Sequence, residues 1–592
     1  MSHRSVLVLL LTVAIGLAFG EINLLKNADF ELSTFSESSG AWYANGCSAT
    51  ASDDSYTGAH SVRVTNRRGT WAGMSYHLTL KPGTNYYFKA HIKLQNVPTH
   101  DLTANTQVMV FLQMTSGSKY LTLSENKVMQ PHIWQAIGGD FTTPADLTSA
   151  RLYIQSKDAS VNYLLDSSSL VEIPPLPINW KTTANATIDK MRKADITVSI
   201  YGHSSTKDLI GVTIEVIQNK HEFGFGSAVK ASAMTNPQET TYQKVFYDNF
   251  EWATIENFLK WRMMEWTEGK VNYATAMNAV DEMLKHGTNI RAHNLFWDRK
   301  SNVPAWLANT TGQALIQQME RRINGIVPRT KGKVEHWDVN NENIHGNFFE
   351  SGTGDVNITM WMFKEVHKVD PTVKLFLNDY GVVKDRYSTQ DTGQHGALIM
   401  LQDYYNQAMM FKARPDVPLY GLGIQAHMHS SIDVSVVKYR LDQMVATGLP
   451  LWITEFDLDV RDDNSRADYL EDLLTLFFST PEVEGIIFWG FWDGNMHAPI
   501  RALFTGSDVK PNAAGRRYQQ LFKRDWRTNI TTPIASGHAS LRGFRGQYTL
   551  RVTKAGHTLK EEKFTLTSKG ADLNVTVSGS GNTMQVSHIL VG

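Results

Sequence analysis

The chain has 592 residues, too many for a single hydrophobic core, so roughly two to four domains are expected. Hydrophobic residues make up 42% of the chain and charged residues 19%, which is an ordinary globular composition. The 57 basic and 58 acidic side chains nearly cancel, so the charge gives no indication of a nucleic acid or an anionic membrane as a partner.

Residues 1–20 have the pattern of a secretory signal peptide. His3 and Arg4 precede an apolar stretch of about 15 residues, and the small residues Ala18 and Gly20 offer a cleavage site. The alternative is an uncleaved membrane anchor, and no other apolar stretch is long enough to span a membrane. We therefore expect a secreted, extracellular protein.

Cysteine and sequon usage bear on the same question. Cys47 is the single cysteine, which excludes an intrachain disulfide. A large core makes that tolerable in a secreted protein. Five Asn-X-Ser/Thr sequons fit a secreted glycoprotein, although such sequons also occur by chance. They begin at Asn185, Asn309, Asn357, Asn529 and Asn574.

Residues 21–172 are predicted to be all-β. Short stretches that alternate apolar and polar residues, such as YYFKAHIKL (Tyr86–Leu94) and QVMVFLQM (Gln107–Met114), are separated by turn residues. Strands of this length and spacing indicate a β-sandwich or jelly roll.

Several stretches of this region, among them NLLKNADFE and NRRGTWAGM, resemble carbohydrate-binding modules of the family 4/9/22 type. The resemblance implies that Trp71, Tyr76 and Trp42 are candidates for a sugar-binding platform, although a core role for Trp71 is an equal alternative. It also implies that Glu31 and Asp166 could hold a structural calcium ion, since carboxylates from separate strands suit that metal.

The middle of the chain has a different rhythm. The proline-marked stretch PPLPINW ends the first region, and we assign residues 173–215 to a linker with lead-in strands. Over residues 216–526, strand-like apolar stretches alternate with helical patterns, which predicts an α/β fold, the (β/α)8 or TIM barrel. Residues 527–592 alternate like hairpin strands and predict a small C-terminal β region. The helical patterns include Thr241–Glu265, Tyr273–Lys285, Gln313–Asn324, Met360–Val366 and Asp433–Ala446.

Two acidic residues follow strand-like stretches inside the predicted barrel. Glu342 comes after VEHWDVNN, and Glu455 ends the apolar run LPLWIT. Catalytic groups of such barrels lie at the carboxyl ends of the strands, so the two glutamates could meet across the barrel mouth. Glycoside hydrolysis needs such a pair, with one carboxyl protonating the leaving oxygen and the other attacking the sugar or activating water. The alternative for either residue alone is an ordinary solvated loop acid.

Seven stretches, in this order, resemble glycoside hydrolase family 10, the endo-β-1,4-xylanases, over about residues 223–525. The long N-terminal lead and the ending NAAGRRYQQLF look most like the animal and plant branch of that family. The stretches are TIENFLKW (Thr254–Trp261), RAHNLFW (Arg291–Trp297), WDVNNE (Trp337–Glu342), NDYG (Asn378–Gly381), GIQAHMH (Gly423–His429), ITEFD (Ile453–Asp457) and IIFWGFWD (Ile486–Asp493).

The resemblance implies roles for individual residues. Glu342 would be the general acid/base and Glu455 the nucleophile. Asn341 would bind the 2-hydroxyl at the cleavage point, and His427 would orient Glu455. The remaining substrate-binding candidates, with Trp297 and Trp489 as apolar walls, are Glu256, Asn257, Lys260, His293, Trp297, Gln425 and Trp489.

Some residues depart from the family pattern. Asp298 stands where histidine is usual, and Asn340 stands where an apolar residue is usual. Neither Trp492 nor His497 aligns securely with the second tryptophan that many microbial members carry near the cleavage point, which leaves the choice between xylan and glucan open.

We therefore predict a secreted, modular, retaining endo-β-1,4-xylanase that acts as a monomer and needs no cofactor. Its partner is xylan or a related β-1,4-linked polysaccharide, and tethering by the N-terminal module would raise the local substrate concentration. The alternatives are a β-1,4-glucanase on the same scaffold and a non-catalytic polysaccharide-binding protein.

Overall fold

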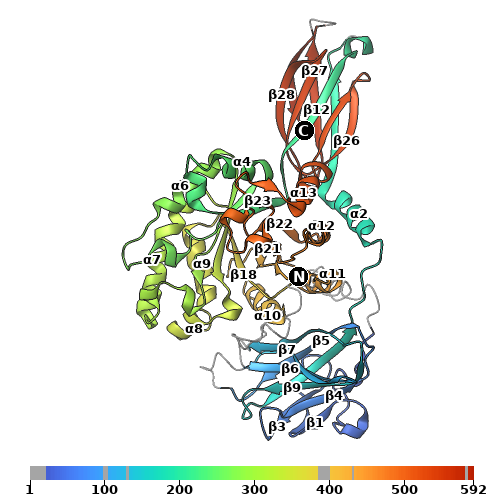
Figure 1. Ribbon diagram of the computed structural model, residues 1–592, viewed down its shortest axis with the longest axis vertical. Coiled ribbons are helices and arrows are strands. Elements are labelled where there is room, and N and C mark those ends of the chain that lie inside the picture. The colour runs from blue at the N-terminus through green and yellow to red at the C-terminus, as the bar shows by residue number, and fades with distance from the viewer. Residues whose placement is uncertain are drawn as a thin grey trace, which may run out of the picture.

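The computed structural model of the protein describes residues 22–592 except 98–104, 128–131, 204, 384–400, 430–431 and 580–583. A barrel lies between two β-sandwiches, one at each end of the long axis of the molecule (Figure 1). The predicted signal peptide falls outside the described residues. None of the helices in the described part of the chain is long and apolar enough to cross a membrane.

The N-terminal part is a sandwich of two antiparallel five-stranded sheets, as predicted. The sheets have the strand orders β1-β4-β9-β6-β7 and β2-β3-β10-β5-β8. Inward-facing residues alternate with outward-facing ones, and the inward set forms one apolar core between the sheets. The strands are β1 (Tyr43–Asn45), β2 (Ser48–Ser52), β3 (Ser61–Thr65), β4 (Gly73–Leu78), β5 (Asn85–Leu94), β6 (Asn105–Met114), β7 (Gly117–Lys127), β8 (Gln135–Thr142), β9 (Leu147–Ser156) and β10 (Tyr163–Glu172).

The middle part is a closed parallel barrel, which confirms the predicted fold class. The strand order runs β15-β14-β13-β22-β21-β19-β18-β17, and pairing of β15 with β17 closes the ring. Every residue of β21 is buried, as expected for a strand that is covered on both faces. The strands are β13 (Gly224–Val229), β14 (Trp252–Ile255), β15 (Asn289–Ala292), β17 (His336–Asn341), β18 (Lys374–Asp379), β19 (Gly421–Ile424), β21 (Leu451–Leu458) and β22 (Val483–Phe488).

Helices follow the barrel strands and cover their outer faces (Figure 1). Side chains of Asp433, Asp462 and Asn512 accept backbone N–H groups at the starts of α11, α12 and α13, which satisfies donors that a helix leaves free. The pattern at 241–265, predicted as one helix, instead contains α4, strand β14 and α5. The helices are α3 (Ala231–Thr235), α4 (Thr240–Asn249), α5 (Trp261–Met264), α6 (Ala274–Lys285), α7 (Gly312–Thr330), α8 (Phe348–Thr353), α9 (Ile358–Val369), α10 (Leu401–Lys412), α11 (Val434–Val445), α12 (Asp463–Ser479) and α13 (Ala513–Gln520).

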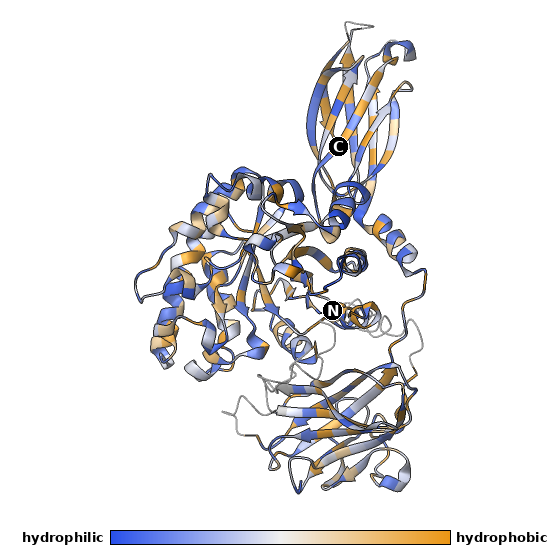
Figure 2. Cartoon of the chain, in the orientation of Figure 1, coloured by the Kyte–Doolittle hydropathy of each residue, from blue (hydrophilic) through white to orange (hydrophobic). Residues whose placement is uncertain are grey.

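The strands predicted in residues 173–215 and the β region predicted for residues 527–592 pair with each other. β11 and β12 are not lead-in strands of the barrel, because they pair with C-terminal strands to form a second sandwich with sheets β26-β11-β29-β30 and β25-β12-β27-β28. Its strands alternate between hydrophobic and hydrophilic residues (Figure 2), and the hydrophobic ones share a separate core. The strands are β11 (Lys193–Tyr201), β12 (Val212–His221), β25 (Asn529–Pro533), β26 (His538–Phe544), β27 (Gly546–Lys554), β28 (His557–Leu566), β29 (Ala571–Ser578) and β30 (Gln585–Val591).

Helix α2 (Trp180–Arg192) connects the N-terminal sandwich to this second sandwich and packs on the barrel. The buried guanidinium of Arg192 donates to the carbonyl oxygens of Phe478 and Thr480 at the end of α12 and of Val483 at the start of β22. The chain therefore passes through the second sandwich twice, first in β11 and β12 before the barrel and again in β25 to β30 after it.

The N-terminal sandwich rests directly on helices α10 and α11 of the barrel. The side chain of Asn406 exchanges two hydrogen bonds with the backbone of Ala136, at 2.8 and 3.0 Å. Arg440 and Asp140 form an ion pair at 2.7 Å that is almost fully buried. These contacts hold the sandwich in a fixed position beside the helices rather than on a free linker.

Candidate active site

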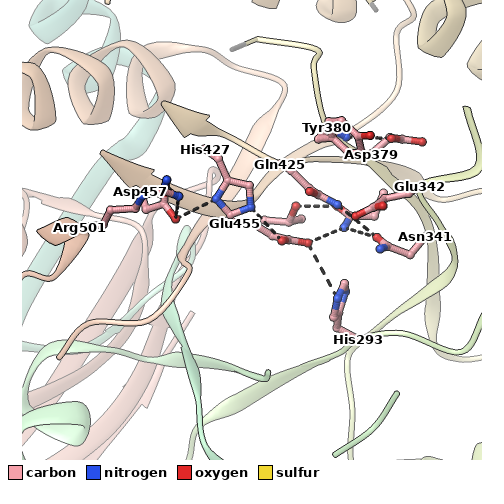
Figure 3. A network of polar contacts seen from close by, with 12 residues as sticks. His293, Asn341, Glu342, Asp379, Tyr380, Gln425, His427, Glu455, Asp457 and Arg501 are labelled. Atoms are coloured by element: carbon pink, nitrogen blue, oxygen red, sulfur yellow. Dashed lines mark hydrogen bonds and ion pairs between the residues drawn. The ribbon is translucent and has the colours of Figure 1, made fainter. Parts of the chain in front are cut away.

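The predicted site residues lie where the barrel strands end. Glu342 follows β17, Glu455 is in the second half of β21, and Trp489 follows β22. Because the strands are parallel, their carboxyl ends share one end of the barrel, which brings side chains from distant parts of the sequence together (Figure 3).

Glu455 is buried and held by groups on two sides. Its Oε1 accepts a hydrogen bond from Nδ2 of Asn378 at 3.0 Å and lies 3.9 Å from Nε2 of His293. Its Oε2 lies 3.2 Å from Nε2 of His427, on the short strand β20 (His427–Met428). Burial raises the pKa of Glu455, but the hydrogen bond from His427 and the charges of His293, His427 and Lys260 outweigh it and leave the pKa below its ordinary value. An ionised Glu455 fits a nucleophile.

His427 connects Glu455 to a second carboxylate. Its Nδ1 lies 2.8 Å from Oδ2 of Asp457, and Arg501 is 3.2 Å from the other oxygen of Asp457. Burial opposes protonation of the ring, but Asp457 and Glu455 together raise the pKa of His427 to about 10. His427 is therefore a cation that donates to both carboxylates, and Asp457 fixes its ring orientation (Figure 3).

Glu342 has a different environment. It adopts a left-handed backbone conformation with φ of 56°, its N–H donates to the carbonyl oxygen of Asn378, and its Oε2 lies 3.3 Å from Arg299. Burial and the negative charge of Asp379 raise the pKa of Glu342, Glu455 adds to this, and Arg299 opposes it. A protonated Glu342 fits a general acid.

The two glutamates thus have pKa values displaced in opposite directions. Burial acts on both, and the difference comes from their neighbours: cations and an amide face Glu455, whereas carboxylates outweigh the cation at Glu342. A carboxylic acid beside a carboxylate is the arrangement that glycoside hydrolysis requires.

Between the two glutamates lies a set of amide side chains. Asn378 donates from Nδ2 to Oδ1 of Asn341 at 2.8 Å as well as to Glu455, and its own Oδ1 accepts from Thr454 at 2.6 Å. Gln425 donates to the same oxygen of Asn341 at 3.4 Å. Nδ2 of Asn341 is buried and has no hydrogen-bond partner within the described part of the chain, so it is available to a substrate hydroxyl.

The sequence suggested no role for Asn378, although NDYG was one of the seven stretches that resemble the family. The structure places this residue at the centre of the amide set, because its side chain contacts Asn341 and Glu455 at once. The sequence feature that could have indicated this role is an amide side chain near the carboxyl end of a barrel strand. Arg299 and Asp379, which set the charge around Glu342, were also missed.

The predicted sugar-binding residues form one wall of the site. Nζ of Lys260 lies 4.7 Å from the ring centre of Trp297 and 5.6 Å from that of Trp489. Lys260 also donates to Asn257 at 3.3 Å, and Asn257 donates to Glu256 at 3.2 Å. His293 packs edge-on against Trp489 and bonds Asp338 at 2.9 Å. Polar groups and two indole rings therefore line the same space, as sugar binding requires.

Two predictions for the N-terminal sandwich are wrong. Trp42 is completely buried and Tyr76 is 5% exposed, and the two rings pack together in the core at 5.4 Å. Tyr76 belongs to the core between the sheets, and its neighbours Ser75 and His77 on β4 face the other way because successive side chains of a strand alternate. Trp71 is 52% exposed and remains a candidate for sugar contact.

Glu31 and Asp166 both bind the loop that precedes β3. Glu31 accepts the N–H groups of Ala59 and His60, and Asp166 accepts those of Tyr56 and Thr57. These carboxylates are therefore hydrogen-bond acceptors in the structure, and the calcium ion stays a prediction. Within the described ranges, no group of three or more His, Cys, Asp or Glu side chains could hold a metal ion.

The outer face of the sheet β1-β4-β9-β6-β7 carries aromatic side chains that sequence analysis did not identify. Strand register places Tyr43, Ser75, Tyr153 and Met109 side by side in one row. The next row on the same face contains His77, Arg151, Phe111 and Tyr120. We call these eight residues the aromatic face. Tyr120 is 62% exposed and lies 4.8 Å from Phe111 and 6.4 Å from Tyr153.

The barrel with its paired glutamates has the arrangement of a glycoside hydrolase. Residues 214–514, about half of the chain, match the model of glycosyl hydrolase family 10, and residues 22–161 match that of a carbohydrate binding domain. The chain belongs to glycosyl hydrolase family 10.

Relatives with curated names support the same family. The chain is 27% identical to "Endo-1,4-beta-xylanase 1" of Arabidopsis thaliana over 95% of this chain and 58% of that protein. It is 34% identical to "Anti-sigma-I factor RsgI6" of Acetivibrio thermocellus over 65% of this chain and 48% of that protein. The chain thus spans less than two thirds of either relative.

Solved structures also resemble the chain at a low level. Xylanase 10B from Thermotoga petrophila, in complex with xylobiose, is 20% identical with a TM-score of 0.45, covering 55% of this chain and 99% of that one. The two-module Xyn10B of Clostridium thermocellum, in complex with xylohexaose, is 16% identical with a TM-score of 0.42, covering 82% of this chain and 96% of that one. The family assignment rests on the family match and not on these scores.

Proposed function

We propose that this protein is an endo-β-1,4-xylanase that cleaves internal bonds of xylan by double displacement with retention of configuration. The observation that carries the proposal is the opposite displacement of the pKa values of Glu342 and Glu455 at one end of the barrel. Family membership and the named xylanases among the relatives support the substrate.

In the first step Glu455 attacks the anomeric carbon, and Glu342 gives its proton to the leaving glycosidic oxygen. The sugar–oxygen bond breaks and a glycosyl ester forms on Glu455. Esterification removes the negative charge that helps to raise the pKa of Glu342. Glu342 can then take a proton from the water that attacks the ester, which returns both carboxyls to their starting states. No cofactor takes part in these steps.

The amide of Asn341 suits a contact that strengthens during the reaction. Its buried Nδ2 is available to donate to a substrate hydroxyl beside the reacting carbon, and such a contact would lower the barrier if it is stronger in the transition state than in the ground state. The indoles of Trp297 and Trp489 would pack against the sugar rings.

A comparison of substrates tests the proposal. Reducing-sugar release is measured from xylan and from carboxymethyl-cellulose, for the wild type and for Glu455→Ala. Xylan hydrolysis that the variant loses is the expected result. Preference for carboxymethyl-cellulose would point to the glucanase alternative, and a folded protein inactive on both would favour a polysaccharide-binding protein.

We propose that the N-terminal sandwich binds polysaccharide through the aromatic face. The family match to a carbohydrate binding domain supports binding, and the exposed ring of Tyr120 beside Phe111 and Tyr153 supports the location. Because the sandwich is docked on α10 and α11, the captured chain would be held at a fixed position relative to the barrel. The pattern of residues 1–20 supports export from the cell, and detection of a mature N-terminus near residue 21 in culture medium would test it.

A further inference from the structure

A buried polar network lies directly behind the loop that carries Glu342. Asp298 is fully buried, and its Oδ1 accepts the N–H of Phe349 at 3.0 Å. Its Oδ2 accepts from the side-chain amides of Asn340 at 3.3 Å and of Asn343. The two departures noted in the sequence, Asp298 and Asn340, are therefore in direct contact and belong to one structure.

Asn343 is the centre of this network. Besides Asp298, its Nδ2 donates to Oε1 of Glu350 at 2.8 Å, and its Oδ1 accepts from Nε2 of Gln407 on α10. Thr359 joins the network by donating to the same oxygen of Glu350 at 3.1 Å and by accepting from Asn340 at 2.9 Å. Asparagine suits this position because its side chain donates and accepts at the same time.

The network forms hydrogen bonds with the chain on both sides of Glu342. Asn340 and Asn343 are bonded to Asp298, and between them Asn341 is bonded to Asn378. Glu342 has a left-handed backbone, which an L-residue adopts only when its surroundings enforce it. The side chains that hold it come from Asp298, directly after β16 (Phe296–Trp297), and from α8, α9 and α10. Their hydrogen bonds in this network do not involve the carboxyl group of Glu342.

We propose that Asn343, held by Asp298, Glu350 and Gln407, is the positioning residue for the general acid/base Glu342. This inference rests on the proposed function. Proton transfer requires the acid within hydrogen-bond reach of the leaving oxygen, so a small shift of Glu342 weakens acid catalysis. It affects the attack by Glu455 less, because the side chain of Asn343 bonds Asp298, Glu350 and Gln407. Glu455 is held by Asn378 and His427.

This separation gives a readout that loss of stability alone would not produce. A leaving group such as 2,4-dinitrophenolate departs without a proton, whereas a sugar alkoxide needs one. The ratio kcat/KM reports the first irreversible step, which is formation of the glycosyl ester. A misplaced Glu342 therefore lowers kcat/KM on xylohexaose and spares it on 2,4-dinitrophenyl β-xylobioside.

The experiment compares the full-length wild type with Asn343→Ala on both substrates. We expect kcat/KM on xylohexaose to fall at least about tenfold, since general acid catalysis contributes about 10²- to 10⁴-fold, and kcat/KM on the aryl glycoside to fall less than about threefold. Asp298→Asn is a second variant that keeps the size of the side chain while removing an acceptor, and it should show the same selectivity to a smaller extent.

The control is Asn249→Ala, at the end of α4. Asn249 is also buried and its side chain also makes two hydrogen bonds, to Val245 and Gln519, but it precedes β14 and so lies at the opposite end of the barrel. We expect Asn249→Ala to leave the ratio of kcat/KM on the two substrates unchanged. Equal losses on both substrates, or no loss in a folded Asn343→Ala, would overturn the inference. An inactive wild type would instead contradict the proposed function.

Discussion

Nε2 of His427 lies 3.2 Å from Oε2 of Glu455, and the same ring is anchored at 2.8 Å by Asp457. The imidazole thus places a positive charge against the nucleophile. Asp457 and Glu455 bond opposite nitrogens of the ring, which orients His427 toward the nucleophile, and the two carboxylates raise the pKa of His427 to about 10 against the opposing effect of burial.

Replacement of His427 should make the nucleophile harder to ionise. His427→Ala removes the hydrogen bond and the charge that lower the pKa of Glu455, so that pKa rises and the acidic limb of the kcat/KM–pH profile moves to higher pH. A hydrogen bond to a charged group contributes about 1.5–3 kcal/mol, which predicts a loss of roughly 10- to 100-fold. His538→Ala, an exposed histidine of the second sandwich, is the control. An unchanged acidic limb would show that His427 does not act on Glu455.

Arg299 should act on the other limb. It lowers the pKa of Glu342, so Arg299→Met should raise that pKa and move the basic limb to higher pH. The shift should be below about one pH unit, since Arg299 is partly exposed and water screens its charge. Arg299→Lys keeps the charge and should leave the limb in place. A basic limb that moves down in the methionine variant would contradict this account of the charge around Glu342.

Asp379 should have the opposite effect on the same limb. Its negative charge raises the pKa of Glu342, so Asp379→Asn should lower that pKa and move the basic limb to lower pH. The amide keeps the shape of the side chain and can still accept the N–H of Ile344. Opposite movements in the Arg299 and Asp379 variants would identify Glu342 as the titrating acid, whereas movement in the same direction would exclude it.

The docking of the N-terminal sandwich should be sensitive to one buried ion pair. Asp140→Ala removes the carboxylate of this buried pair, and breaking a buried pair by removing one member costs about 3–5 kcal/mol. Differential scanning calorimetry should show a lower Tm or a separate transition for the sandwich. Lys438→Ala, on the same helix α11, removes an exposed pair with Asp442 and should cost less than about 0.5 kcal/mol. Equal effects of the two variants would mean that the buried pair does not hold the interface.

The aromatic face and Trp71 are competing locations for polysaccharide binding. Tyr120→Ala removes an exposed ring from the aromatic face, and Trp71→Ala removes one from a loop outside the sheet. We expect Tyr120→Ala to weaken the binding free energy for insoluble xylan by about 1–3 kcal/mol, in proportion to the apolar area lost. Co-sedimentation of the protein with insoluble xylan measures this binding. Trp71→Ala should have a smaller effect, and the reverse order would move the site to the loop.

The barrel and its two glutamates could be predicted from the sequence because their signals are local. A buried strand followed directly by an acid occurs twice, and family-like motifs surround both acids. Asn378 could not be assigned from the same information, because its role depends on contacts with Asn341 and Glu455, which come from two other strands.

The errors have physical causes. β11 and β12 alternate like any sandwich strands, but their partners β26 and β27 lie more than 300 residues away, and no local pattern reveals that pairing. Tyr76 was predicted on a binding surface from the family resemblance, and strand alternation could not correct this because it does not say which of two faces is covered. Asp298 and Asn340 looked like isolated departures, and only the fold shows that they contact each other.

Direct labelling of the nucleophile tests the central claim most sharply. The wild type is incubated with 2,4-dinitrophenyl 2-deoxy-2-fluoro-β-xylobioside, whose fluorine slows hydrolysis of the glycosyl ester, and the labelled peptide is identified by mass spectrometry. The account predicts one disaccharide adduct, on Glu455, and none in Glu455→Gln. An adduct on another residue, or turnover of xylan that inverts the anomeric configuration, would contradict it.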